Sequence, residues 1–352
     1  MPLDLDAYVR AAPKAELHVH LEGAIRPTTL LELARRNHVE LPTTDLEGLR
    51  RWFVFRDFPH FVEIYMAITR CLQTAADYEL IVHEFGAEMA RQNVRYAEVT
   101  FTPASHQVRG IPHDAWFGGL SRGRERARTE FGVEIAWVFD LPRSMVARQP
   151  GLGDDTVAVA IEGITDGVVA LGLGGIEAGF PPEPFAPWFD QARAAGLRSV
   201  PHAGETVGPV SVRGALEALG AERIGHGVRA IEDSALVAEL AARGIPLEVS
   251  PTSNLRLGVY PDYAAHPLPR LLAAGIELTV NSDDPPLFNT TLNDEYVLLP
   301  TEFGLGIDEI DRIILNGVRH SFLPTARKEA LAREFAAELA DLRASLVANG
   351  DR

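Results

Sequence analysis

The sequence has very little cysteine and no long apolar run. Cys71 is the single cysteine among 352 residues, so no disulfide can form within the chain and no cysteine-rich zinc site can be built. No run of about 18 apolar residues occurs, which argues against a membrane-spanning helix. No signal peptide is recognisable either. We therefore expect a cytoplasmic protein without a membrane partner.

Positive charge is also scarce. Lys14 and Lys328 are the only lysines, and 33 basic residues against 49 acidic ones give a formal net charge of −16. Such a charge repels polyphosphate over long range, so nucleic acid is not expected as a partner. With 46% apolar and 23% charged residues the chain can bury a large core. We expect one domain over residues 1–352.

Short apolar runs alternate with longer amphipathic stretches from end to end, which predicts strands alternating with helices. Short connections between them imply parallel strands joined by right-handed crossovers. Eight such units favour a (β/α)8 TIM barrel, with a doubly wound open sheet as the alternative. The predicted strands are residues 15–20, 95–101, 133–139, 167–172, 198–202, 223–226, 245–250 and 277–282.

Extra helices are expected between strands 1 and 2 and at the C-terminus. Residues 325–349 predict one long helix or a helix pair, and residues 52–61 form a segment dense in aromatic side chains. Because this segment lies between the first two strands, it could fold over the mouth of the barrel as a lid. Its phenylalanines could equally be ordinary helix-packing core, and the sequence favours neither reading.

Polar residues follow several predicted strands at their carboxyl ends. His18 and His20 end the first strand, and the i, i+2 spacing projects both imidazoles to one face. His202 ends the fifth strand and Asp283 follows the eighth. Three imidazoles and one carboxylate form a mixed nitrogen and oxygen set suited to zinc or another borderline divalent ion, with a position left open for water.

Two further residues fit the roles of acid and base. A metal-bound water ionises near neutral pH but still needs a base for its proton and an acid for the leaving step. Glu205 lies three residues beyond His202, across a glycine that lets the backbone turn, and His226 lies between two glycines. We predict that both face the metal.

Taken together, these segments resemble the adenosine deaminase family of the amidohydrolase superfamily, over nearly the whole chain. The segments that carry the resemblance are Pro13-Lys-Ala-Glu-Leu-His-Val-His-Leu-Glu-Gly23, His202-Ala-Gly-Glu205, Arg223-Ile-Gly-His-Gly227, Ser250-Pro-Thr-Ser-Asn254 and Asn281-Ser-Asp-Asp-Pro285.

The resemblance implies one zinc ion per chain and hydrolytic deamination at C6 of a 6-aminopurine nucleoside. Glu205 would protonate purine N1, and His226 would orient the water and accept its proton. Asp284 would contact the water and N7, and the backbone N–H of Gly175 would meet N3. Glu22 stands where many adenosine enzymes have an aspartate for the ribose 5′-hydroxyl, so the 5′ pocket is expected to differ.

Other departures resemble a bacterial subgroup that includes aminodeoxyfutalosine deaminases, whose substrate is a 5′-extended adenosine bearing a benzoate. Arg143, just beyond the third strand, could clamp that carboxylate, with Arg148 as a second candidate. Adenosine stays open as the substrate, and free adenine is the alternative.

A metallohydrolase with a lysine between two metals is disfavoured, because no lysine ends a strand. The other seven histidines are predicted to be structural or solvated.

Overall fold

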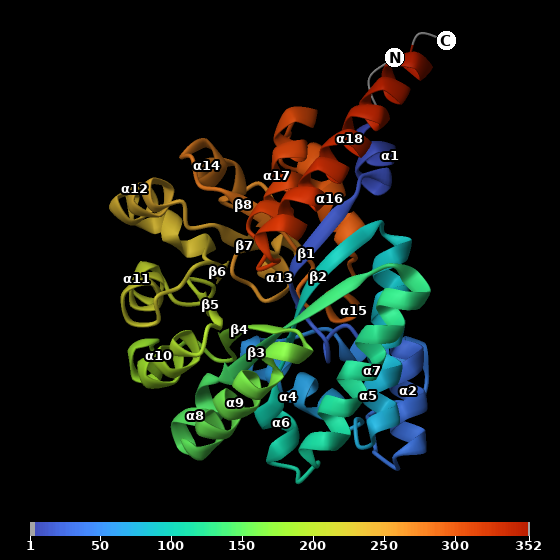
Figure 1. Cartoon of the computed structure of the whole chain (residues 1–352), viewed down its shortest axis with the longest axis vertical. Coiled ribbons are helices and arrows are strands. Elements are labelled where there is room, and N and C mark those ends of the chain that lie inside the picture. The colour runs from blue at the N-terminus through green and yellow to red at the C-terminus, as the bar shows by residue number, and fades with distance from the viewer. Residues whose placement is uncertain (1–3, 351–352) are drawn as a thin grey trace.

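The computed structural model describes residues 4–350, in which eight parallel strands follow one another in chain order around a barrel (Figure 1). The end of β8 closes the ring onto β1: the His20 N–H donates to the Asp283 carbonyl at 2.9 Å, and the Asp283 N–H donates to the His18 carbonyl at 3.1 Å. The strands are β1 (Lys14–His20), β2 (Val94–Phe101), β3 (Glu134–Pro142), β4 (Val168–Gly174), β5 (Arg198–Ala203), β6 (Ile224–His226), β7 (Leu247–Val249) and β8 (Leu278–Val280).

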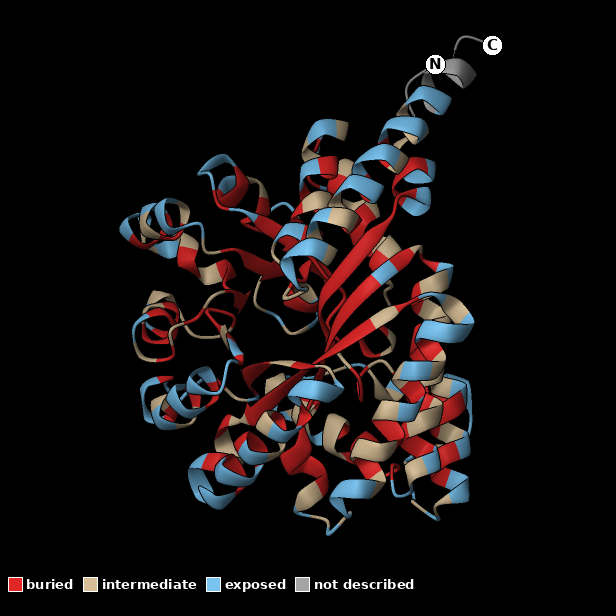
Figure 2. Ribbon diagram, viewed as in Figure 1, coloured by how far each residue is buried: buried red, intermediate tan, exposed pale blue. Residues whose placement is uncertain are grey.

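The predicted TIM barrel is confirmed, and the open sheet is wrong. Each predicted strand bound lies within three residues of the observed one. The strands are buried on both faces, as their nearly continuous apolar sequences require, while the surrounding helices expose only their outer sides (Figure 2).

Helices connect and surround the strands. Up to β4 they are α1 (Leu5–Ala11), α2 (Pro27–Arg36), α3 (Leu46–Trp52), α4 (Phe58–Thr69), α5 (Ala75–Arg91), α6 (Pro103–Gln107), α7 (His113–Phe131), α8 (Arg143–Arg148), α9 (Gly151–Glu162) and the 3-10 turn η1 (Gly163–Asp166). After β4 they are η2 (Glu183–Phe185), α10 (Ala186–Ala194), α11 (Pro209–Ala218), η3 (Val228–Glu232), α12 (Ser234–Arg243), α13 (Pro251–Arg256), α14 (Leu268–Ala273), α15 (Pro285–Phe288), α16 (Leu292–Thr301), α17 (Ile307–Arg319) and α18 (Thr325–Gly350).

The C-terminal addition packs on the barrel through an amphipathic helix. In α17 the buried residues Ile310, Ile313, Ile314 and Val318 recur at helical spacing, and this face lies against β1 and β8. The last segment forms the single helix α18 rather than a pair, and it packs against α17. The searched part of the chain contains no helix long and apolar enough to cross a membrane.

The extra helices between β1 and β2 place aromatic side chains over the mouth of the barrel. Phe58 and Phe61 of α4 line the central cavity. Phe61 also stacks on Phe288 of α15 at a centroid distance of 5.6 Å, and Phe55 meets the same ring edge-on at 5.8 Å. The segment 52–61 therefore both lines the cavity and packs in the core. The two interpretations that the sequence left open, a cover over the mouth and helix-packing core, each describe part of its side chains.

A buried ion network crosses the barrel interior below the mouth. Arg223, just before β6, donates from Nε to Glu248 of β7 at 2.5 Å and from Nη2 to Glu98 of β2. Its guanidinium carbon lies 3.8 Å from the centre of the Phe322 ring. All three charged side chains are buried, so each charge depends on its partners for stabilisation.

We predict that Arg223→Met lowers the free energy of unfolding by about 3–5 kcal/mol, because it leaves two buried carboxylates without a counter-charge. Urea denaturation at equal metal loading measures the change. Arg198→Met is the matched control, since the Arg198–Glu222 ion pair is exposed and is worth less than about 1 kcal/mol. Equal losses in the two variants would contradict the role given to the buried network.

Candidate active site

His18 and His20 project from β1 into the mouth of the barrel, while Val19 between them points into the core. His18 Nδ1 lies 2.8 Å from Glu248 Oε2 and donates to it, which turns Nε2 toward Asp283, whose Oδ1 is 3.6 Å away. That Nε2 is buried and has no hydrogen-bond partner. A carboxylate that fixes one ring nitrogen and leaves the other free is the usual support of a metal-binding histidine.

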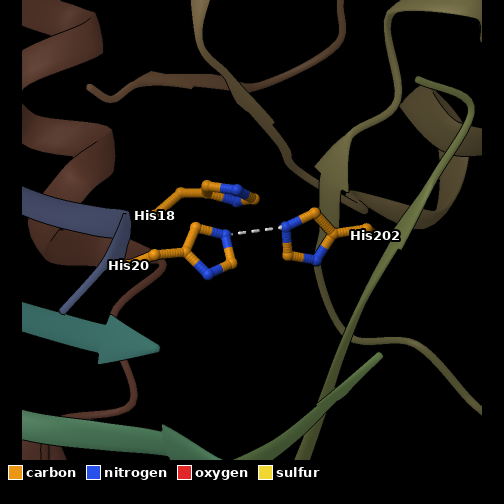
Figure 3. A group of neighbouring side chains, drawn as sticks. All are labelled: His18, His20 and His202. Atoms are coloured by element: carbon orange, nitrogen blue, oxygen red, sulfur yellow. Dashed lines mark hydrogen bonds between the residues drawn. The ribbon is translucent and has the colours of Figure 1, made fainter. Parts of the chain in front are cut away.

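His202 approaches the same point from β5, on the opposite side of the barrel (Figure 3). Its Nε2 lies 3.2 Å from Nε2 of His20. Two nitrogens bound to one zinc ion at tetrahedral angles are about 3.3 Å apart, since each lies about 2.0–2.1 Å from the metal. The two imidazoles are thus spaced as ligands of one ion.

Asp283 completes the group from the end of β8. Its backbone has the left-handed φ of +62°, a conformation costly for a residue with a side chain and typical of functional sites. Its Oδ1 lies 3.6 Å from His18 Nε2 and 3.4 Å from His20 Nε2. The structure thus places the donor atoms of His18, His20 and His202 close enough together to hold one metal ion, and Asp283 lies within 3.6 Å of two of these three imidazoles.

The protonation of His18 bears on metal binding. Burial lowers the pKa of its imidazole, but the nearby carboxylates of Asp283 and Glu248 outweigh burial and raise this pKa to about 10. A metal must therefore displace a proton from Nε2, so metal affinity should rise with pH.

Glu205 and His226 lie beside the ligand group, as predicted. Glu205 Oε1 is 3.7 Å from His226 Nε2, and that nitrogen is 3.8 Å from Asp283 Oδ2. Burial raises the pKa of the Glu205 carboxyl well above its ordinary value, and the charge of Asp283 adds to this effect. The metal-free arrangement thus favours the protonated form of the Glu205 carboxyl.

Glu177 fixes the loop that carries Glu205. Its carboxylate accepts the backbone N–H groups of Gly204 at 2.6 Å, Thr206 at 2.8 Å and Val207 at 2.7 Å. Glu177 is not among the site residues predicted from the sequence, although it is the first acidic side chain after β4. Gly204 itself has a φ of +71°, the turn expected at that glycine.

Asp284 is buried against a glycine that leaves no room for a side chain. A Cβ atom at Gly23 would lie 1.6 Å from Asp284 Oδ1, so only glycine fits there. Burial, followed by repulsion from Asp283, raises the pKa of Asp284 well above its ordinary value. Its Oδ1 has no hydrogen-bond partner, and Asp284 lines the cavity.

A cavity of about 330 Å³ opens directly onto these residues, within the usual size of a small-molecule site. Gly175, with a φ of +80°, forms part of its wall. So do Thr102 and Asp140, which the sequence analysis did not single out. Thr102 Oγ1 donates to Asp140 Oδ1 at 2.6 Å, and burial raises the pKa of Asp140 to about 7. Asp140 was recognisable as the one charged residue in the buried stretch Ile135–Leu141 of β3.

The structure does not place Glu22 and Arg143 on the cavity wall. Glu22 is buried behind it, where its carboxylate meets Tyr65 OH at 3.1 Å and His106 Nε2 at 3.0 Å. Arg143 is fully buried, and its two Nη atoms donate to the carbonyls of Phe180 at 2.5 Å and His202 at 2.6 Å. In this arrangement Arg143 supports the backbone at His202 instead of facing a ligand.

Two histidines that were predicted to be structural or solvated are buried supports of the site. His106 bridges Glu22 and the hydroxyl of Tyr78. His266 Nε2 lies 3.0 Å from the side chain of Asn254, which in turn contacts His226. Sequence spacing gave no sign of these contacts, because the partners lie on different elements.

A (β/α)8 barrel that gathers three histidines and an aspartate at the carboxyl ends of its strands, beside a buried carboxyl group, is an arrangement typical of metal-dependent hydrolases. The comparisons narrow this class. The family model described as "Adenosine deaminase" matches residues 13–338. The chain belongs to that family and is a hydrolytic deaminase, which confirms the resemblance found in its sequence.

Relatives named after different substrates have similar sequence identities to this chain. An aminodeoxyfutalosine deaminase from Streptomyces coelicolor is 43% identical over 95% of this chain and 86% of its own. An adenine deaminase from Albidiferax ferrireducens is 39% identical over 91% of each chain. The solved structure of an adenine deaminase from Arthrobacter aurescens has a TM-score of 0.87 at 34% identity, covering 93% of this chain and 99% of that one.

We predict that Glu248→Gln weakens zinc binding about 10-fold to 100-fold, because His18 Nδ1–H then donates to a neutral amide and no longer to a charged carboxylate. Competition with a chromogenic chelator at fixed pH measures the affinity. Glu98→Gln is the matched control, since it removes the same charge from beside Arg223 but leaves the Glu248–His18 contact intact. An equal loss in Glu98→Gln would instead assign the effect to the ion network.

Proposed function

We propose that this protein catalyses hydrolytic deamination at C6 of a 6-aminopurine nucleoside that is extended at its 5′ carbon, with aminodeoxyfutalosine as the leading candidate. The observation that carries the reaction type is the buried carboxyl of Glu205, with a raised pKa, beside the metal-type ligands on one cavity. The 43% identity to two Streptomyces aminodeoxyfutalosine deaminases supports the candidate substrate.

One zinc ion per chain would be held by His18, His20, His202 and Asp283. Zinc in a site with an open position lowers the pKa of water and makes it nucleophilic near neutral pH. The orphaned Nε2 of His18 and the 3.2 Å spacing of the other two imidazoles support this choice. A related amidohydrolase from Burkholderia ambifaria, 28% identical with a TM-score of 0.88 and with matched regions covering 97% of this chain and 94% of that one, was solved with bound zinc.

The protein's own groups would then act on the purine. Glu205 donates its proton to N1, which makes C6 electrophilic so that water adds there. One proton of the water passes to the amino nitrogen, the bond between C6 and that nitrogen breaks, and ammonia leaves. The other proton returns to the Glu205 carboxylate, and C6 becomes a carbonyl carbon. Asp284 would contact N7 and the Gly175 N–H would contact N3, and both residues line the cavity.

The rest of the cavity favours an apolar extension of the substrate. Its wall carries the large side chains Phe58, Val62, Met66, Met145, Ile176 and Leu257. These surfaces suit the aromatic ring of a benzoate. No lysine or arginine is among the residues lining this cavity. We therefore expect the ring to supply the binding energy while the carboxylate points toward solvent, in place of the clamp by Arg143.

Free adenine is the second candidate substrate. Relatives named adenine deaminase are 36–39% identical to this chain over at least 91% of its length. A pocket for the free base has no need of the apolar wall described above, which is why adenine ranks second.

We predict that Glu205→Gln lowers kcat about 10²-fold to 10⁴-fold, the usual contribution of a general acid. KM should change by only a few-fold, because the amide can still donate a hydrogen bond to N1. Steady-state ultraviolet assays of the zinc-loaded enzyme measure both constants. An unchanged kcat would remove Glu205 from the proton transfer.

The same residue predicts a pH dependence. A raised pKa means that Glu205 carries its proton below that pKa and loses it above, so kcat should fall as the pH rises through this value. The alkaline limb should be absent from the residual activity of Glu205→Gln. If the limb persists unchanged in the variant, another group titrates there.

We predict that kcat/KM for aminodeoxyfutalosine exceeds that for adenosine by more than tenfold, equivalent to about 1.4 kcal/mol of transition-state binding beyond the 5′ carbon. The assay compares these two with 5′-methylthioadenosine and adenine. A preference for adenine would establish the second candidate. Failure of every adenine-containing compound with zinc-reconstituted protein would reject the proposed function.

Arg143→Met provides the control for the substrate panel. Since the guanidinium holds backbone carbonyls, all substrates should lose kcat/KM by the same factor. A loss confined to the carboxylated substrate would instead make Arg143 the carboxylate clamp.

A further inference from the structure

A buried chain of hydrogen bonds runs from α14 to the catalytic histidine. The Leu268 N–H donates to His266 Nδ1 at 3.3 Å. His266 Nε2 lies 3.0 Å from Asn254 Oδ1, and Asn254 Nδ2 lies 3.2 Å from His226 Nδ1. All four residues are buried, so no water competes for these contacts.

The first bond determines the direction of the others. A backbone amide can only donate, so His266 Nδ1 must accept. Burial lowers the pKa of His266 to about 3, so the ring is neutral and its one proton sits on Nε2. The atom of Asn254 that faces this N–H must then be the carbonyl oxygen. The orientation of the amide, which distances alone leave undecided, is thereby fixed.

The donor-to-acceptor direction of these hydrogen bonds also fixes the bond to His226. The NH2 group of Asn254 faces His226 Nδ1 and donates to it, so Nδ1 has a lone pair and the ring proton must sit on Nε2. A doubly protonated ring would set two N–H groups against each other across 3.2 Å, so the chain also disfavours the imidazolium. The opposite tautomer would require the amide to flip and would break the bond from His266.

We propose that Asn254 and His266 are positioning residues that hold His226 in the tautomer with its proton on Nε2. His226 then enters the cavity as a hydrogen-bond donor, aimed at the space between Glu205 and Asp283, 3.7 and 3.8 Å away. A donor there can orient the oxygen of the attacking water. It has no lone pair to take a proton, so the accepting role implied by the family resemblance is not available to the resting ring.

The direct test is the ¹⁵N NMR spectrum of protein labelled at histidine, recorded metal-free and zinc-loaded. The His226 signals are identified by their loss in His226→Gln. We expect Nε2 of His226 to resonate as a protonated, pyrrole-type nitrogen and Nδ1 as an unprotonated, pyridine-type one. A pyridine-type Nε2 in the native protein would overturn the proposal, whatever the substrate proves to be.

Asn254→Asp should reverse the tautomer, because a carboxylate of the same shape accepts from both histidines and draws the proton to His226 Nδ1. The two ¹⁵N signals should exchange character. Asn293→Asp, the same substitution in α16 away from this chain, is the control and should leave them unchanged. An unaltered His226 spectrum in Asn254→Asp would contradict the proposal, and His266→Phe, expected to give mixed tautomers, tests it independently should Asn254→Asp not fold.

The catalytic consequence rests on the proposed deaminase function, whereas the tautomer does not. With a substrate that the native enzyme deaminates, Asn254→Asp should lose about 10²-fold in kcat, the effect of one missing preorganised donor, with KM changed only a few-fold. If the tautomer reverses and kcat stays native, the donor role of His226 is refuted. If no adenine compound reacts with the native enzyme, only the function fails.

Discussion

The carboxylate of Glu248 is the interaction on which the rest of the site depends. One of its oxygens accepts from Arg223 in the barrel interior and the other accepts from His18 at the mouth. The buried charges inside the barrel therefore also decide which nitrogen of His18 faces the other predicted metal ligands. The Glu248 carboxylate belongs both to the buried ion network and to the support of His18. A substitution in that network therefore also affects the predicted metal ligands.

The buried carboxyl groups divide into two kinds according to their neighbours. Burial opposes ionisation of Glu248 and Asp283, yet Arg223 and His18 hold the pKa of Glu248 below its ordinary value, and His18 does the same for Asp283. Glu205 and Asp284 have no such partner and their pKa values are raised. Two carboxyl groups with lowered pKa values thus lie beside two with raised pKa values, and this contrast is typical of an acid–base site.

Sequence periodicity and strand-end residues were enough to predict the barrel and to bring His18, His20, His202 and Asp283 to one point. This worked because the carboxyl ends of barrel strands must meet, so a residue's place in its strand fixes its place in the fold.

Sequence alone did not reveal the residues that act through others. Glu177 accepts hydrogen bonds from the loop that carries Glu205, and Asn254 is hydrogen-bonded to His226. Both contacts join elements that are far apart in the sequence, and residue spacing does not predict in which direction these side chains point. Arg143 illustrates the reverse case: it follows β3 at the correct end, yet its side chain is turned into the backbone by two carbonyl oxygens. Position on a strand predicts proximity to the site, and only packing decides whether a side chain reaches it.

The central claim is that one metal ion joins β1, β5 and β8 at the mouth of the barrel. X-ray absorption at the zinc edge, combined with the zinc content of the purified protein, tests it most directly. The account predicts one zinc per chain, with a first shell of three imidazole nitrogens at about 2.0–2.1 Å and carboxylate oxygen at about 2.0–2.2 Å. A shell without imidazole, a second metal at a short distance, or protein that binds no zinc would contradict it.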